Sequence, residues 1–206
     1  MLCYKNGALA REQVRSTYTE GHWHIFNEKV ETTPPGNNGY LGFYFPLIEI
    51  IPPNVHGSFF FKDGKPVETI PDEAHPRAIL ESQFLSIKSR IAAILPPDSP
   101  LLHRLILTGG SSQNHTFRQL AADVFGLPTY VAETKEAAGH GGALLALYAW
   151  WKKKNGGVGT FEELKDRLVE KMQLVARPRM EITSIYDGLV ESYRIAEDQV
   201  VRLCSQ

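Results

Sequence analysis

The sequence has almost no net charge, few cysteines and no long apolar run. Its 206 residues carry a formal net charge of -1, and the basic residues are scattered apart from the run Lys152-Lys153-Lys154. Three lysines at a helix end are typical of a solvated terminus, so the composition disfavours a nucleic-acid-binding surface. The longest apolar stretch, residues 143–151, is too short to span a bilayer. We therefore expect neither a nucleic-acid nor a membrane partner.

The two cysteines, Cys3 and Cys204, lie at opposite ends of the chain. This placement fits reduced thiols better than a disulfide framework. No N-terminal apolar segment precedes a small-residue cleavage site, so no secretory signal is predicted. These features indicate a cytoplasmic protein, and the length suits one substantial domain covering residues 1–206.

The most informative stretch is residues 105–125. It begins with three apolar residues, 105–107, continues through Gly109 and Gly110, and then shows apolar residues at helical spacing from Phe117 onward. The order is therefore strand, glycine turn, helix, and Gly126 with Pro128 predicts the end of the helix. Glycine lets a ligand approach bare backbone, and the unpaired amides at a helix N-terminus suit a nucleotide phosphate or sugar.

A purely structural interpretation of this turn is also open. Many α/β proteins use Gly-Gly only to connect a strand to a helix, and Ser112 or Asn114 would then serve as the N-cap. The stretch matches neither the dinucleotide-binding glycine fingerprint nor the P-loop. A ligand role therefore depends on what surrounds the turn.

Other elements follow from periodicity and turn residues. Helix 76–95 carries one apolar stripe that includes Phe84, so Glu81, Gln83, Lys88 and Arg90 are predicted to be solvated. Residues 137–143 are dense in glycine and alanine, which indicates close approach by a neighbouring backbone or a ligand. We expect further helices at 8–17, 24–30, about 144–151, from 160 and around 185–200, and strands at 2–4, 41–45, 57–61 and 129–131.

Three further sets of residues are candidates for a site. Trp23 offers an aromatic face, either for core packing or as a platform for a flat ring. His22 and His24 flank it, but no third ligand stands at metal-site spacing, so no metal site is predicted. Ser112 with His115 could suggest a hydrolase, although the nucleophile-elbow motif is absent.

Several separated motifs resemble one family in the same order. They span nearly the whole chain: residues 2–7 (LCYKNG), 36–45 (GNNGYLGFYF), 77–84 (RAILESQF), 107–114 (LTGGSSQN) and 121–125 (AADVF). The chain resembles the C-terminal domain of eukaryotic-type xylulose kinases in the FGGY carbohydrate kinase family. The resemblance implies an α/β, actin-like ATPase (ribonuclease H-like) domain: a mixed sheet with flanking helices and a truncated first strand.

The resemblance also implies a function and a set of site residues. The family phosphorylates D-xylulose with ATP and Mg²⁺ in a cleft between two actin-like domains. Carried onto matching positions, Gly109, Gly110 and Asn114 would bind the adenosine and α-phosphate of ATP or ADP, and Trp23 would lie against the adenine. Glycines admit the nucleotide, Asn114 offers both a donor and an acceptor, and Trp23 offers a stacking face.

The sequence departs from the family pattern where phosphoryl transfer is concerned. The family's catalytic aspartate lies in a Gly-Asp-Asn stretch, and these 206 residues contain no Gly-Asp pair. The family's Gly-Thr-Ser phosphate loop and sugar-binding first domain are likewise unmatched. We therefore expect a kinase portion without catalytic or metal-binding residues of its own, whose partners are an adenine nucleotide and the N-terminal domain. The alternative is a non-catalytic module of actin-like fold that binds adenine nucleotides or another protein.

Overall fold

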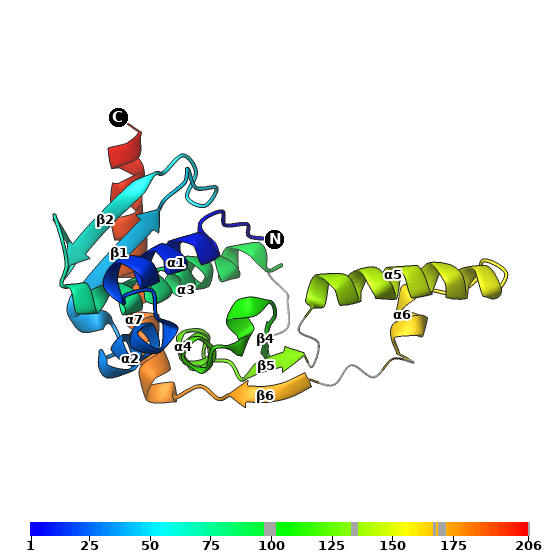
Figure 1. Ribbon diagram of the computed structural model, residues 1–206. Coiled ribbons are helices and arrows are strands. Elements are labelled where there is room, and N and C mark those ends of the chain that lie inside the picture. The colour runs from blue at the N-terminus through cyan, green and yellow to red at the C-terminus, as the bar shows by residue number, and fades with distance from the viewer. Residues whose placement is uncertain (97–101, 133–135, 167, 169–171, 206) are drawn as a thin grey trace.

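The computed structural model describes residues 1–96, 102–132, 136–166, 168 and 172–205, folded as helices around two small sheets (Figure 1). The first sheet is antiparallel in the order β1 (Tyr40–Phe45), β2 (Gly57–Lys62), β3 (Lys65–Val67). In the second sheet β4 (Leu105–Leu107) runs parallel to β5 (Thr129–Ala132), which pairs antiparallel with β6 (Met172–Ala176). The second sheet is therefore mixed, as the resemblance implied, whereas the first is not.

Two helices precede the first sheet, and the remaining helices follow it, interspersed with the strands of the second sheet. They are α1 (Gly7–Tyr18), α2 (Trp23–Thr32), α3 (His75–Ile94), α4 (His115–Phe125), α5 (Ala137–Lys154), α6 (Phe161–Lys165) and α7 (Met180–Cys204), with short 3-10 turns η1 (Asn37–Gly39), η2 (Asp72–Ala74) and η3 (Gly110–Gln113). None of the helices in the described part of the chain is long and apolar enough to cross a membrane. The predicted helices are all present, and β3 and β6 are the strands that periodicity missed.

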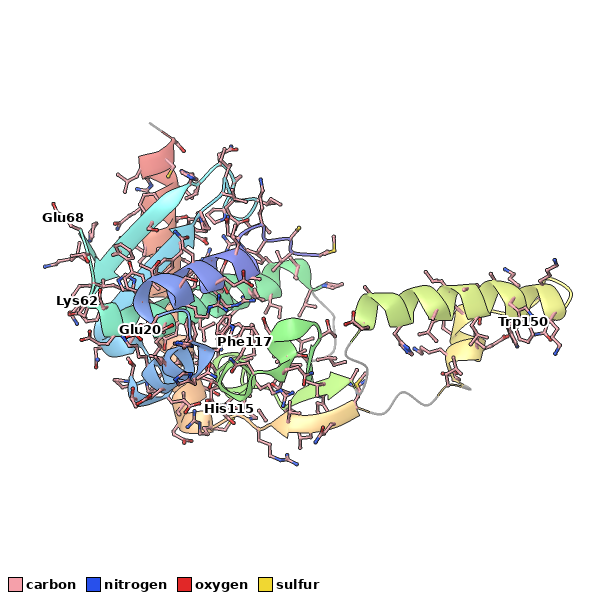
Figure 2. The ribbon with its side chains drawn as sticks, viewed as in Figure 1. Glu20, Lys62, Glu68, His115, Phe117 and Trp150 are labelled. Atoms are coloured by element: carbon pink, nitrogen blue, oxygen red, sulfur yellow. The ribbon has the colours of Figure 1, made fainter. Side chains whose placement is uncertain are left out.

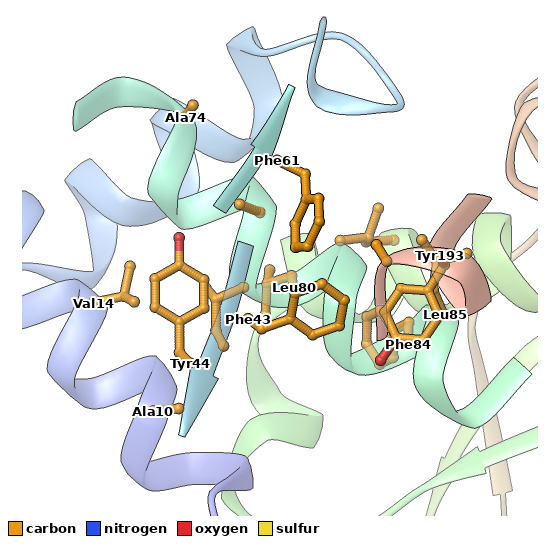
Figure 3. Close-up of a cluster of buried hydrophobic side chains, with 14 of the residues drawn as sticks. Ala10, Val14, Phe43, Tyr44, Phe61, Ala74, Leu80, Phe84, Leu85 and Tyr193 are labelled. Atoms are coloured by element: carbon orange, nitrogen blue, oxygen red, sulfur yellow. The ribbon is translucent and has the colours of Figure 1, made fainter. Parts of the chain in front are cut away.

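Helix α3 forms the centre of the core because it contacts β1, α1, α2, α4 and α7. Phe84, on its predicted apolar stripe, is buried beside Leu80 and Leu85 (Figure 3). On the sheet side, Phe43 and Phe61 are fully enclosed, with their ring centroids 5.8 Å apart. The last four residues of β1 are buried, and its aromatic side chains and the apolar stripe of α3 thus belong to one cluster.

The prediction that Glu81 is solvated is wrong. The residue is 2% exposed, and its carboxylate lies 2.7 Å from Nε of Arg77, one helical turn earlier. Tyr186 Oη donates to the same carboxylate oxygen at 2.7 Å, and the backbone N–H of Gly36 donates at 3.0 Å. A charge on the buried side of α3 is tolerated because the network satisfies it.

The other three polar residues predicted to be solvated on α3 also have partners. Gln83 bonds to Arg11, Lys88 lies 2.6 Å from Asp187, and Arg90 pairs with Glu197. Helix α3 is surrounded on most sides, so a single stripe cannot describe which of its residues are enclosed. Its outer end behaves differently, since Ile94 is 47% exposed.

Residues 2–4, predicted to end a truncated strand, are not in a strand. The segment is instead fixed through Glu49, whose carboxylate accepts hydrogen bonds from the backbone N–H of Lys5 at 2.7 Å and of Asn6 at 3.0 Å. Burial acts to raise the pKa of Glu49, but hydrogen bonds from Lys5, Ile50 and Asn6 outweigh it and lower the pKa. The Glu49 carboxylate therefore holds the backbone of residues 5 and 6 directly after the segment that was predicted to be a strand.

Helix α4 lies between the core and the second sheet (Figure 1). It ends at Gly126, which has the left-handed φ of +66° that the predicted glycine stop requires. Its buried Asp123 accepts from the backbone N–H of Arg179 at 2.8 Å and pairs with the Arg179 guanidinium at 2.6 Å. This pair fixes the start of α7 against α4.

Helices α5 and α6 extend away from the rest of the chain (Figure 1). None of the residues of α5 is buried, and Trp150 near its end is 57% exposed (Figure 2). A Cβ added to Gly141 or Gly142 would meet no atom within 4 Å. Among the described residues no neighbouring backbone therefore approaches these two glycines, and the alternative that the small residues admit a ligand stays a prediction. Helix α6 begins at a capping box between Thr160 and Glu163.

Candidate functional site

The glycine turn connects β4 to α4 through η3. Gly109 adopts φ +78° and ψ -173°, a conformation that is essentially restricted to glycine. Gly110 has no such restriction, and a Cβ added there would meet no atom within 4 Å. Gly109 therefore shapes the turn, whereas Gly110 leaves open space beside it.

That space belongs to an open groove with a volume of about 530 Å³. Its walls come from α1, α2, α3, η3 and the start of α4. The lining residues are Ala8, Arg11, Glu12, Trp23, Phe26, Leu80, Gly110, Ser111, Gln113, Asn114 and Phe117. A mostly apolar groove with a few polar groups is typical of a small-molecule site.

Trp23 stands at the edge of this groove, at the first residue of α2. It is 38% exposed, so it is not a core residue. The Arg15 guanidinium lies 4.8 Å from the Trp23 ring centroid, and Phe26 packs edge-on at 5.3 Å. These contacts fix the orientation of the indole while leaving part of its surface accessible.

Asn114 has two structural partners. Its Oδ1 accepts from the backbone N–H of Phe117 at 3.1 Å, so it is the N-cap of α4 as one interpretation predicted. Its Nδ2 donates to Oδ1 of Asn27 at 2.9 Å, which connects α4 to α2. One N–H and further lone-pair capacity remain for a ligand, because an amide offers two donors and two lone pairs.

Arg11 spans the gap between α1, α3 and the glycine turn. Its guanidinium donates to Oε1 of Gln83 at 2.6 Å and to Oγ of Ser111 at 2.9 Å. It also lies over the ring of Phe117, at 5.2 Å from the centroid; Phe117 belongs to the first turn of α4 (Figure 2). Burial lowers the pKa of Arg11 below its ordinary value.

The two competing site types are not formed. Within the described residues no group of three potential metal ligands occurs, and His22 and His24 only contact each other's rings. The Ser112 hydroxyl donates to the carbonyl of Gly109 at 2.6 Å, while His115 Nε2 lies 2.8 Å from Glu31. Ser112 and His115 therefore bond to other groups and not to each other, so no serine–histidine pair supports the hydrolase alternative.

The structure brings Trp23, Gly110 and Asn114 to one groove, although Trp23 and Gly110 are far apart in sequence. Gly109 shapes the turn but is not among the lining residues. Sequence reasoning missed the wall contributed by α1, namely Ala8, Arg11 and Glu12. Their i, i+3, i+4 spacing was readable, but nothing in it indicated that this face meets the glycine turn.

Comparison with known proteins places these features in a family. Residues 51–150 match the C-terminal domain of the FGGY family of carbohydrate kinases. Xylulose kinase 2 of Arabidopsis thaliana is 32% identical over 218 residues, covering 98% of this chain and 39% of its own length. The xylulose kinase of Rattus norvegicus is 31% identical, with 98% and 37% covered.

Solved structures give the same result for the fold. The ligand-bound xylulose kinase from Lactobacillus acidophilus superimposes with a TM-score of 0.74 at 17% identity, covering 96% of this chain and 39% of that one. This likeness confirms the actin-like ATPase fold. The chain spans about two fifths of the length of the curated relatives it matches. The chain belongs to the FGGY family of carbohydrate kinases, as a counterpart of the C-terminal domain of eukaryotic xylulose kinases.

Proposed function

We propose that the groove beside Gly110 binds the adenosine end of ATP or ADP, and that the chain is the nucleotide-binding part of a kinase for D-xylulose. The observation that carries this proposal is the convergence of Trp23, Gly110 and Asn114 on one groove. These are the residues that the family resemblance assigned to the nucleotide. The relatives' own names supply the sugar.

The residues of the groove fit an adenine nucleoside. The open side of Gly110 admits a ring or ribose close to the backbone, and the side chains of Trp23, Phe26 and Phe117 offer apolar and aromatic surface. Asn114, Ser111 and Gln113 supply polar groups at the same edge. This combination of apolar, aromatic and polar side chains suits a flat base joined to a polar sugar.

Phosphoryl transfer itself requires a base, a metal ion and aligned phosphates. The given sequence contains no Gly-Asp pair, so the catalytic aspartate of the proposed kinase comes from a Gly-Asp-Asn stretch outside these 206 residues. The product would be D-xylulose 5-phosphate, and Mg²⁺ would accompany the nucleotide on ligands from the N-terminal domain. The role of this chain is to hold and orient the adenosine.

The substitution Gly110→Val tests the proposal. Because Gly110 lacks a positive φ and its Cβ direction is empty, the fold should tolerate valine, while the branched side chain would fill the space of the ligand. ADP held mainly by its nucleoside end should bind with a dissociation constant of about 1 mM. We expect Gly110→Val to weaken that binding by at least about tenfold, measured by ligand-detected NMR.

Gly188→Val is the matched control. Gly188 lies at an exposed position of α7, has no positive φ, and a Cβ added there also meets nothing within 4 Å. This variant should bind ADP like the unchanged chain. Equal ADP binding by both valine variants would reject the groove as the nucleotide site.

A further inference from the structure

The structure contains a partly buried cation at the groove with no anionic partner. Among the described residues, no carboxylate lies within 4.0 Å of Arg11. Its hydrogen-bond partners, Gln83 and Ser111, are neutral. Arg77 and Arg90 differ from Arg11, since each of them pairs directly with a glutamate. Arg11 thus keeps a positive charge in a wall of the groove with no carboxylate in direct contact.

The surroundings of Arg11 increase the effect of this charge. Arg11 lines the groove on one side and a second cavity of about 130 Å³ on the other. Phe117 contributes to both cavities and lies beneath the guanidinium. A charge next to apolar surface is screened less than one in water, so an anion placed beside it is held more strongly.

The geometry also leaves the guanidinium able to bind such an anion. Gln83 and Ser111 each accept from one terminal nitrogen, and a guanidinium has five N–H donors. The two bonds hold the planar group in a fixed position beside the glycine turn. Arginine presented in this way suits a phosphate, which accepts paired N–H donors.

We infer that Arg11 binds a phosphate of the nucleotide and makes the groove select nucleotides over uncharged nucleosides. This inference rests on the proposed function, because it assigns a residue to the phosphate end of the same ligand. Glu12, the neighbouring groove residue on α1, carries a negative charge that offsets part of the positive charge of Arg11. The balance between these two side chains sets how strongly the groove prefers a charged ligand.

The test compares ADP with adenosine on the 206-residue chain by NMR titration. A charge-assisted hydrogen bond corresponds to about tenfold or more in affinity, so the unchanged chain should prefer ADP by about that factor. Arg11→Gln should remove the preference and leave adenosine binding unchanged. Glu12→Gln should strengthen ADP binding and not adenosine binding. Higher salt should weaken ADP binding in the unchanged chain more than in Arg11→Gln.

Controls separate the charge from its structural bonds. Gln83→Ala removes one hydrogen bond of Arg11 at a residue that does not line the groove and keeps the cation with its bond to Ser111, so the ADP preference should persist. Arg202→Gln removes one positive charge near the C-terminus of α7 and should also leave the preference intact. Thermal melts identify any variant that is not folded. A folded Arg11→Gln that still prefers ADP would overturn the inference, as would equal ADP and adenosine binding by the unchanged chain.

A pyrophosphate titration distinguishes this inference from the proposed function. If adenosine does not bind but pyrophosphate shifts groove signals in the unchanged chain and not in Arg11→Gln, the anion site stands and the adenosine site fails. If adenosine binds at the groove but neither ADP preference nor pyrophosphate binding depends on Arg11, the proposed function stands and the inference fails. Absence of binding by all three compounds contradicts both.

Discussion

Removing the buried carboxylate of Glu81 should strongly destabilise the fold. In the structure the Arg77 and Glu81 side chains are only 7% and 3% exposed, and they meet at 2.7 Å. Glu81→Ala leaves the Arg77 guanidinium enclosed without its charge partner. It also removes the acceptor used by Tyr186 and by the Gly36 backbone N–H.

The expected magnitude follows from the burial of this pair. Breaking one side of a buried ion pair typically costs about 3–5 kcal/mol. For a chain of this size each kcal/mol corresponds to about 2–4 °C in melting temperature. Glu81→Ala should therefore lower the melting temperature by roughly 6–20 °C, measured by differential scanning calorimetry.

Two further variants show where the cost arises. Glu191→Ala is the control, because Glu191 is 74% exposed and lies 3.8 Å from Arg194, so its loss should change stability by no more than about 0.5 kcal/mol. The double variant Arg77→Met/Glu81→Leu removes both charges and should recover part of the loss. Similar melting temperatures for Glu81→Ala and Glu191→Ala would refute the buried network and restore the sequence-based prediction of a solvated Glu81.

Three other predictions follow from the core, the N-terminal segment and the composition of the site. Phe84→Ala should lower the free energy of unfolding by about 3–5 kcal/mol, because the residue is 5% exposed and its ring centroid lies 4.8 Å from that of Phe117. A near-zero change in the free energy measured by chemical denaturation would contradict the place of Phe84 in the core. The pKa of Glu49 is lowered in the folded state, so the ionised carboxylate stabilises the fold above the unfolded pKa of about 4.3, and this stabilisation is lost as pH falls through the folded pKa. Glu49→Gln should therefore flatten the dependence of stability on pH over that range. An unchanged dependence in this variant would contradict the prediction. The 206-residue chain with D-xylulose and MgATP should form no sugar phosphate in a coupled assay; turnover abolished by a mutation within this chain would show that it holds the catalytic machinery.

Local patterns in the sequence predicted much of the fold. The strand, glycine turn and helix around Gly109 are present, and Gly126 ends α4 as expected. The stripe of α3 correctly placed Phe84 in the core. These features are determined by residues close together in the sequence, so turn residues and apolar periodicity are enough to predict them.

Long-range polar pairing could not be read in the same way. Glu81 looked like a surface residue because its partner Tyr186 lies 105 positions away and a buried charge is costly without a partner. Glu49 likewise holds residues 5 and 6 through the backbone, which no side-chain pattern reveals. The exposure of α5 was also unexpected, since its glycines and apolar residues indicated packing.

The residues of the candidate site also fall into those that the sequence predicted and those that only the folded structure reveals. Gly109, Gly110, Asn114 and Trp23 came from motifs and resemblance, and three of them line one groove. Arg11 and Glu12 belong to a helix whose sequence carries no ligand signature. Only the packing of α1 against α3 and the glycine turn gives them a place in the groove.

Chemical-shift mapping of ADP on the labelled chain tests the central claim most directly. Backbone amides of residues 109–114 and the indole N–H of Trp23 should shift in proportion to bound ADP, because these groups border the groove. Signals from the exposed helix α5 should remain unchanged. Shifts confined to α5, or no shift at residues 109–114 and Trp23 at saturating ADP, would contradict the assignment of this groove to the nucleotide.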